Sequence, residues 1–247
     1  MADLARGSEI AEARHGQRLR TGAPPFDPLF MYAFHTPKTA GALRVLCLGA
    51  HADDIEIGAG GLILELIRRS EVPVDIDWVV FSAPPKRETE ARRSAKLFLE
   101  GARRKRVMVN HFKDGFFPYD AKVKHVFESL KPVKPDLVLT HYRNDRHQDH
   151  RVLSDLTWNT FRDHLILEYE IPKFDGDLGS PNCFVPLEKA ICDLKVKYLH
   201  DAFGTQRDKH WFTAETFMGL MRLRGMECRA RPGYAEAFYV RKAVLEF

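Results

Sequence analysis

The sequence predicts an α/β protein with a Rossmann-like, mostly parallel sheet, helices on both faces, and a single domain. The first observation behind this prediction is that short apolar segments alternate four times with segments of helical periodicity. The second is that no clear linker divides residues 41–247. The third is the composition, because 45% hydrophobic and 29% charged residues are typical of a globular protein. This composition excludes a disordered, collagen-like or coiled-coil chain.

The alternation can be followed element by element. Residues 43–50 (LRVLCLGA) form a continuous apolar run, which is typical of a strand buried on both faces of a parallel sheet. A helix is expected over 57–70, because Leu62, Leu66 and Ile67 share one face. Strands are then expected over 72–82, 106–111 and 135–140, and helices over 87–99, 120–130 and 150–162. Such alternation implies right-handed crossovers between parallel strands.

The remaining segments are less regular. Residues 171–186 hold three prolines and two glycines and are expected to form a long loop. Helices are expected over 187–200 and 213–224, and a late strand over 235–241. Residues 1–40 are expected to form an irregular arm, whose aromatic residues suggest docking on a partner or self-association into a homo-oligomer.

The charge and the cysteines restrict the classes of function. The formal net charge of +4 is too mild to indicate a nucleic-acid binder. The dense basic run Arg103–Arg106 is expected on a solvated turn before a strand, with a phosphate-binding patch as the less favoured interpretation. The four cysteines form no CxxC pair, which favours reduced thiols in the cytoplasm. The first ten residues have no apolar core typical of a secretory signal, so none is expected, and no stretch of about 18 apolar residues predicts a membrane span.

Polar residues that carry chemistry follow two of the predicted strands. In parallel sheets, ligands bind beyond the carboxyl ends of the strands. A catalytic zinc site needs three protein ligands and an open position for water, and His51, Asp54 and His150 can supply the ligands. His141 also lies in the second segment, but nothing in the sequence decides whether it enters the site. The His and Asp residues concerned are His51, Asp53 and Asp54 after the first strand, and His147, Asp149 and His150 after the fourth.

Each of these residues has an ordinary structural interpretation when taken alone. A single histidine at a strand end more often caps or hydrogen-bonds than binds metal, and Asp53 and Asp54 are both suited to a helix N-terminus. Six such residues on two loops at one sheet edge favour a metal site instead.

The combination resembles the LmbE-like, or PIG-L-like, zinc N-deacetylase family. The matching segments are Ala50-His51-Ala52-Asp53-Asp54, Gly58-Ala59-Gly60-Gly61 and His147-Gln148-Asp149-His150. Family members typically have proline where this chain has Ala52, and an acid where it has Ile55. Weaker similarities are Arg87-x-x-Glu90, Gly204-Thr205-Gln206 and Tyr234-Ala235-Glu236-Ala237-Phe238, so that the resemblance spans roughly residues 43–241.

The resemblance implies a role for each matched residue. His51, Asp54 and His150 would bind zinc, Asp53 would be the general base, and His147 would stabilise the oxyanion. These roles agree with general chemistry, because zinc acidifies water and a nearby carboxylate that does not bind the metal can accept the released proton.

Three further residues receive weaker assignments. The resemblance implies that Asp149 orients a histidine. Arg87 can bind a sugar hydroxyl or a phosphate of the substrate, or simply pair with Glu90 on the helix surface. Gln206 can hydrogen-bond the substrate or be an ordinary turn residue.

The function that the resemblance implies is a zinc-dependent hydrolase, which removes an acetyl or other acyl group from an amino sugar or sugar conjugate. Two other functions would each account for part of the sequence. An S-adenosylmethionine-dependent methyltransferase would account for the apolar strand followed by glycines, but residues 51–57 intervene between the two. A non-catalytic zinc- or sugar-binding module would account for the metal ligands, but it would need neither Asp53 nor His147.

Overall fold

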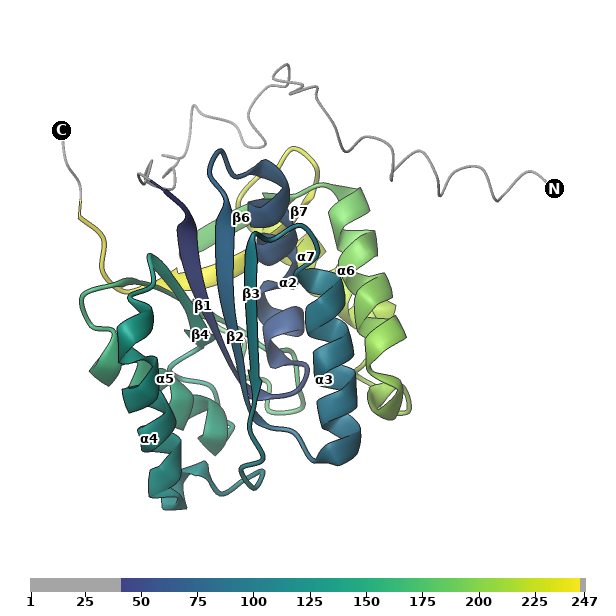
Figure 1. Ribbon diagram of the computed structural model, residues 1–247. Helices are drawn as coiled ribbons and strands as arrows, with labels where there is room; N and C mark the ends of the chain where they lie inside the picture. Colours follow the sequence, from purple (N-terminus) through teal and green to yellow (C-terminus); the bar gives the residue numbers. More distant parts are fainter. Residues whose placement is uncertain (1–40, 245–247) are drawn as a thin grey trace.

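The computed structural model describes residues 41–244, which fold around a seven-stranded sheet with the order β3-β2-β1-β4-β5-β7-β6 (Figure 1). The five strands from β3 to β5 are parallel to one another, and β7 runs antiparallel to both of its neighbours. The strands are β1 Leu43–His51, β2 Val74–Ser82, β3 Arg104–Val109, β4 Leu137–His141, β5 Leu165–Tyr169, β6 Cys183–Leu187 and β7 Tyr234–Val240.

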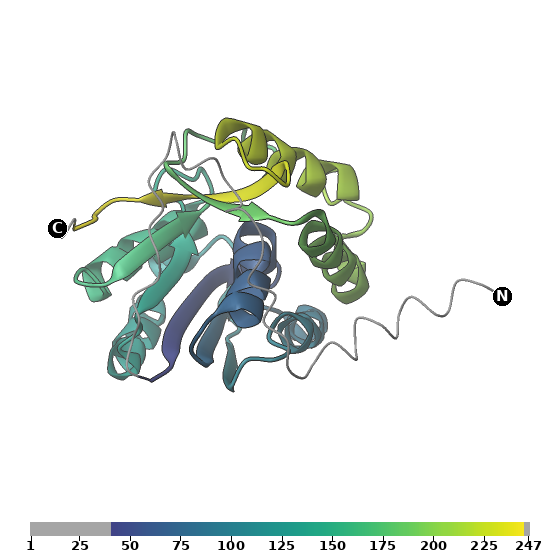
Figure 2. The same cartoon turned by 90° about the horizontal axis from the view of Figure 1, so that it is seen from above.

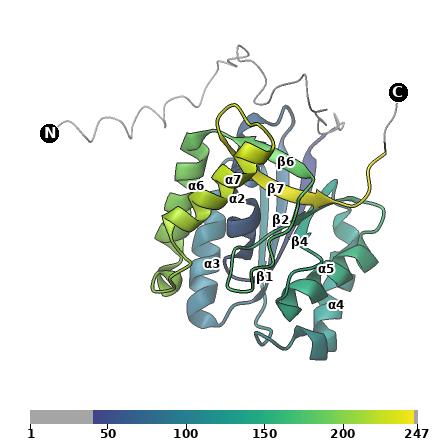
Figure 3. The ribbon, with the colours of Figure 1, turned by 180° about the vertical axis from the view of Figure 1, so that it is seen from behind.

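Helices cover both faces of the sheet, as the sequence predicts (Figure 2). Helices α4 and α5 pack on one face, and α2, α3 and α6 pack on the other, where α7 lies against β7 (Figure 3). Each interface holds its own apolar cluster. The helices are α2 Asp54–Arg69, α3 Pro85–Phe98, α4 Ala121–Leu130, α5 Gln148–Thr160, α6 Lys189–Ala202 and α7 Ala214–Glu227.

Two expectations about the strands need correction. The long loop expected over residues 171–186 runs into β6, which forms one edge of the sheet. Pro186 is tolerated there because an edge strand needs hydrogen bonds on one side only. The basic run Arg103–Arg106 does not lie on a solvated turn, because β3 begins at Arg104. Asp75 and Asp77 of β2 attract this run, and Arg103 forms a bidentate contact with Asp75 at 2.8 and 2.5 Å.

The glycines that follow β1 lie inside helix α2, where they allow close packing. A Cβ atom on Gly58 would lie 2.2 Å from the Tyr169 ring, and one on Gly60 would lie 2.6 Å from Phe98. The glycine cluster therefore brings α2 close to its neighbours. A methyltransferase cofactor loop would instead place its glycines in the turn directly after the strand.

All four cysteines have free thiols. Over residues 41–244, no helix has the length and apolar character needed to cross a membrane. The irregular arm predicted for residues 1–40 falls outside the described residues, so its docking and self-association stay predictions.

Candidate metal centre and active site

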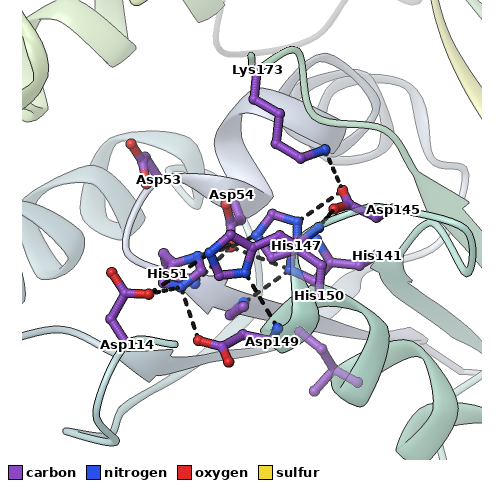
Figure 4. A network of polar contacts seen from close by, with 12 residues as sticks. His51, Asp53, Asp54, Asp114, His141, Asp145, His147, Asp149, His150 and Lys173 are labelled. Atoms are coloured by element: carbon purple, nitrogen blue, oxygen red, sulfur yellow. Dashed lines mark hydrogen bonds and ion pairs between the residues drawn. The ribbon is translucent and has the colours of Figure 1, made fainter. Parts of the chain in front are cut away.

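Three elements bring His51, Asp54 and His150 together at the carboxyl edge of the parallel strands (Figure 4). His51 is the last residue of β1, Asp54 opens α2, and His150 lies in the first turn of α5. Their chain separation is as large as 99 residues, yet the fold makes them neighbours. The neighbouring strands β1 and β4 cause this, because their ends face the same solvent edge.

The three side chains form a nearly equilateral triangle of ligand atoms. His51 Nδ1 lies 3.2 Å from His150 Nε2 and 3.3 Å from Asp54 Oδ2, and the third side, from His150 Nε2 to Asp54 Oδ2, is 3.6 Å. Zinc binds histidine nitrogen and carboxylate oxygen at about 2.0–2.2 Å, which separates tetrahedral ligands by about 3.3–3.6 Å. The triangle therefore has the size of one face of a zinc tetrahedron.

The hydrogen bonds behind the triangle indicate which nitrogen atoms are free to bind a metal. His150 Nδ1 lies 2.9 Å from Asp145 Oδ2, and His51 Nε2 lies 3.1 Å from Asp114 Oδ1. A carboxylate can only accept, so these outer nitrogen atoms carry the protons. The inner atoms, His51 Nδ1 and His150 Nε2, are then two lone pairs that face each other beside a carboxylate. Such a set needs a positive charge between its atoms, which a proton on His51 Nδ1 or a bound metal cation can supply, and the composition of the set fits zinc.

The pKa shifts of Asp54 and His51 favour positive charge beside the triangle, whereas the pKa shift of His150 favours its neutral form, the form that binds a metal. Burial alone would raise the pKa of Asp54, but the imidazoles of His150, His141 and His51 hold it well below its usual range. Burial, reinforced by His141, lowers the pKa of His150 to about 3. Burial also opposes a charged His51, yet Asp54 and the outer carboxylates raise its pKa well above the usual value.

Asp145 supports the triangle, and sequence reasoning gave it no role. Its carboxylate is 2% exposed and accepts hydrogen bonds from His150 Nδ1, the His147 backbone amide and Lys173 Nζ. Lys173 is in turn held by Asp177 at 2.5 Å. The position of Asp145 in the same His- and Asp-rich segment was an available signal, whereas nothing in the sequence pointed to Lys173.

Asp149 joins the start of α5 to the loop after β3. Its buried carboxylate accepts hydrogen bonds from the backbone amides of Gly115 and Phe117 at 2.7 and 3.2 Å. It also lies 3.5 Å from His51 Nε2. This geometry brings Asp149 to the histidine that it is expected to orient. The same loop carries Asp114, a second carboxylate on His51 that the sequence analysis did not identify.

His147 lies at the open side of the cluster, with 33% of its side chain exposed. Its ring packs edge-on against His51 at 4.8 Å between centroids. Its Nδ1 accepts a hydrogen bond from the Asp149 amide at the helix N-terminus, so that Nε2 is left as the N–H donor. Burial and the nearby His51 lower its pKa. A neutral His147 can therefore still donate a hydrogen bond from Nε2.

Asp53, Arg87 and Gln206 belong to one polar chain beside the triangle. Arg87 Nη2 donates to Asp53 Oδ1 at 2.7 Å, and Arg87 Nη1 donates to Thr205 Oγ1 at 3.1 Å. Gln206 Nε2 donates to the same threonine oxygen, and Glu90 also contacts Arg87. Burial raises the pKa of Asp53, while the Arg87 guanidinium acts in the opposite direction. Arg87 thus orients the expected base, and its direct contact with substrate stays a prediction.

His141, which the sequence left undecided, is fully buried against the triangle. Its Nε2 lies 3.3 Å from Asp54 Oδ2 and accepts a hydrogen bond from the Ala50 amide at 3.0 Å. Its ring stacks on His150 with centroids 3.9 Å apart. His141 therefore packs behind the ligand atoms and fixes the orientation of the His150 ring.

Comparison with known proteins adds a family and a fold. Residues 46–161 match the family model described as PIG-L: GlcNAc-PI de-N-acetylase. Similar solved structures include a conserved protein from Thermus thermophilus, at 18% identity and a TM-score of 0.63, which covers 83% of this chain and 97% of that one. N,N'-diacetylchitobiose deacetylase from Pyrococcus horikoshii has 22% identity and a TM-score of 0.61, with 80% and 83% covered.

The same fold also carries other chemistry. GalB from Pseudomonas putida, a 4-carboxy-2-hydroxymuconate hydratase, is 17% identical with a TM-score of 0.62, over 83% of this chain and 99% of that one. At these identities the solved structures establish the α/β fold of this chain. The reaction must be argued from the residues of the site.

Proposed function

The chain carries a PIG-L family domain over residues 46–161, and from this premise we propose that it is a zinc-dependent N-deacetylase. The proposed reaction is hydrolysis of an N-acetyl amide on an amino sugar or sugar conjugate, which yields acetate and a free amine. The observation that supports it most strongly is the triangle of His51 Nδ1, Asp54 Oδ2 and His150 Nε2, whose sides are 3.2–3.6 Å. Its two facing nitrogen atoms and the carboxylate form a set of ligand atoms that a zinc ion would complete.

In the proposed reaction, the metal ion and the protein side chains have different roles. Zinc held by His51, Asp54 and His150 would supply Lewis acidity, which acidifies water and polarises a carbonyl. Asp53 would accept the proton of the attacking water. Its raised pKa suits this task, because a base needs a pKa near the working pH to accept a proton and then release it.

His147 would stabilise the charge that develops on the amide oxygen. Its Nε2–H is held ready by the hydrogen bond that Nδ1 accepts from the Asp149 amide. Removal of one such donor typically costs about 10²–10³ in rate. The departing amine needs one proton. Asp53 can return the proton that it accepted from water, whereas His147 could supply one only if its imidazole were protonated. Arg87, which contacts Asp53, the loop around Asp114, which contacts His51, and Gln206, which contacts Thr205, are proposed to bind the sugar.

A panel of N-acetylated sugars tests the proposal. Zinc-loaded protein should release one amine and one acetate per turnover from at least one member, such as N-acetylglucosamine or N,N'-diacetylchitobiose, and a chelator should abolish release. Binding of these sugars without any release would instead favour the non-catalytic module. Addition of water to a carbon–carbon double bond, with no amide hydrolysis, would favour chemistry of the hydratase kind.

Asp53→Asn isolates the proposed base. The variant should keep its zinc, because Asp53 is not one of the three ligands, and should lose roughly 10²–10⁴ in kcat. Asparagine can still accept the hydrogen bond from Arg87, so the fold should be retained. Elemental analysis and the amine-release assay are the measurements. Turnover at the wild-type rate would remove Asp53 from the mechanism.

The cytoplasmic location of the protein also stays a proposal.

A further inference from the structure

A cavity of about 700 Å³ lies beside the metal centre, between residues 142–146, which connect β4 to α5, and residues 175–179 of the long loop. We propose that this cavity binds the phosphate group of a small molecule. None of His51, Asp53, Asp54 and His147 lines it. The proposed site is therefore separate from the deacetylation residues, and it does not depend on the proposed function.

Three arginines give the cavity its positive charge. Arg143, Arg146 and Arg151 all line it and are exposed. Within residues 41–244, the structure gives none of the three guanidinium groups an ion pair with a carboxylate. The Arg143 guanidinium lies 5.3 Å above the Trp158 ring, and Arg151 donates to the carbonyl oxygens of Asp145 and Arg146. Guanidinium groups bind phosphate oxygens in pairs, which makes phosphate the matching ligand.

The acidic residues on the lining do not cancel this charge. Asp145 already accepts from His150, Lys173 and the His147 amide. Asp177 accepts from Lys173 and from the backbone amide of Arg146. Of the three acidic residues that line the cavity, only Asp175 is exposed. The three arginines and Lys173 carry four positive charges against the three carboxylates, so one positive charge remains and the balance favours an anion.

The cavity and the metal centre share one wall. Asp145 lines the cavity and also holds His150 Nδ1, whose ring presents Nε2 to the triangle (Figure 4). Lys173 extends this series of hydrogen bonds from Asp145 to Asp177 in the long loop. A phosphate in the cavity would thus lie behind His150, on the side away from His51.

Titration of inorganic phosphate into isotope-labelled, zinc-loaded protein at low ionic strength tests the proposal. The backbone amide signals of Arg146, Gly176 and Gly179 should shift together and saturate. Arg146→Ala should weaken the affinity roughly tenfold, and Arg143→Ala/Arg146→Ala should weaken it further. Salt should weaken it as well, because the contact is between charges at an open surface.

A matched control and two contrary results make the test decisive. Arg231→Ala removes an exposed arginine that does not line the cavity and should leave the affinity within about twofold. Signals that shift only around His51 and Gly115 would place phosphate at the metal and overturn the proposal. Equal affinity in wild type and the double variant would also overturn it. Amide signals elsewhere in each variant report whether it is folded.

Discussion

Two groups of buried charges contact helix α2, and they are built in opposite ways. At its second turn, Lys195 Nζ donates to the Ile57 carbonyl at 2.6 Å and to Glu236 Oε1 at 2.7 Å. Glu236 in turn accepts from the Gly61 and Leu62 amides, both at 2.7 Å. The ammonium group and both carboxylate oxygens of this pair therefore have hydrogen-bond partners. The pair is complete without any ligand, as buried charges generally must be.

At the first turn of α2, the His51–Asp54–His150 triangle is incomplete. Three ligand atoms face one another there within 3.6 Å. The outer imidazole nitrogens of His51 and His150 point to Asp114 and Asp145, and the His51 backbone amide donates to Asp54 Oδ2 at 2.6 Å. Both groups are buried, and both carry ionisable residues. The balance of donors and acceptors separates them: a complete pair stabilises the fold, and a surplus of lone pairs marks a site for a cation.

The largest expected effect comes from removing a corner of the triangle. Asp54→Ala should reduce bound zinc from about one per chain to near zero, because two histidines alone hold zinc weakly. Amide hydrolysis should fall to background. Zinc should raise the unfolding temperature of wild type by binding the folded state, and it should no longer do so in the variant. Elemental analysis, the amine assay and thermal unfolding measure these effects.

Lys195→Met is the matched control for Asp54→Ala, because it alters the complete pair and leaves the three ligand atoms in place. It should retain zinc in proportion to the folded fraction. If Asp54→Ala kept a full complement of zinc, the distinction between the two groups would be lost.

Breaking the buried pair of Lys195 and Glu236 should reduce the stability of the fold without removing a metal ligand. Glu236→Leu leaves Lys195 as an uncompensated buried charge and two helix amides without their carboxylate, which should cost about 3–5 kcal/mol of unfolding free energy. Urea denaturation of zinc-free protein measures it. Lys189→Ala, which removes an exposed lysine paired with Asp193 on the same helix, should cost less than about 1 kcal/mol. A Glu236→Leu variant as stable as the Lys189→Ala variant would show that the pair does not support α2.

The alternating strands and helices of the first half of the fold could be predicted, because the sequence patterns that indicate them lie within each element. The apolar run at 43–50 and the three later strands follow from composition along the chain. Strand β5 Leu165–Tyr169 was not predicted, since it has only five residues and includes Glu168. That carboxylate is buried because it accepts from Trp158 and Arg241, and neither partner could be inferred from the sequence. Strand β6 was hidden for a similar reason, because Pro186 is compatible only with an edge whose position depends on topology.

The part of the candidate site that lies at the ends of strands could be predicted from the sequence. His51 and His150 follow strands that prove to be neighbours, so a rule about the carboxyl edge was enough to bring them together. The supporting contacts were not predictable, since they depend on side-chain geometry. Lys173 comes from a loop without periodicity and reaches Asp145 across 28 residues. Arg87 was expected to contact substrate, but the structure shows that it also holds Asp53.

The smallest effect should come from Asp145→Asn, which weakens the support of the triangle while leaving its three corners intact. Asparagine can still accept the proton of His150 Nδ1, but it lacks the charge that makes the imidazole a stronger ligand and that pairs with Lys173. Partners of this kind typically contribute 10–100-fold to metal affinity, so zinc should bind roughly 10–100-fold more weakly. Competition against a chromophoric chelator measures the change. Asp155→Asn removes an exposed carboxylate from α5, the helix that carries His150, and should leave the zinc affinity unchanged. If both variants bound zinc as wild type does, the orientation of His150 would have to come from its stacking on His141 instead of from Asp145.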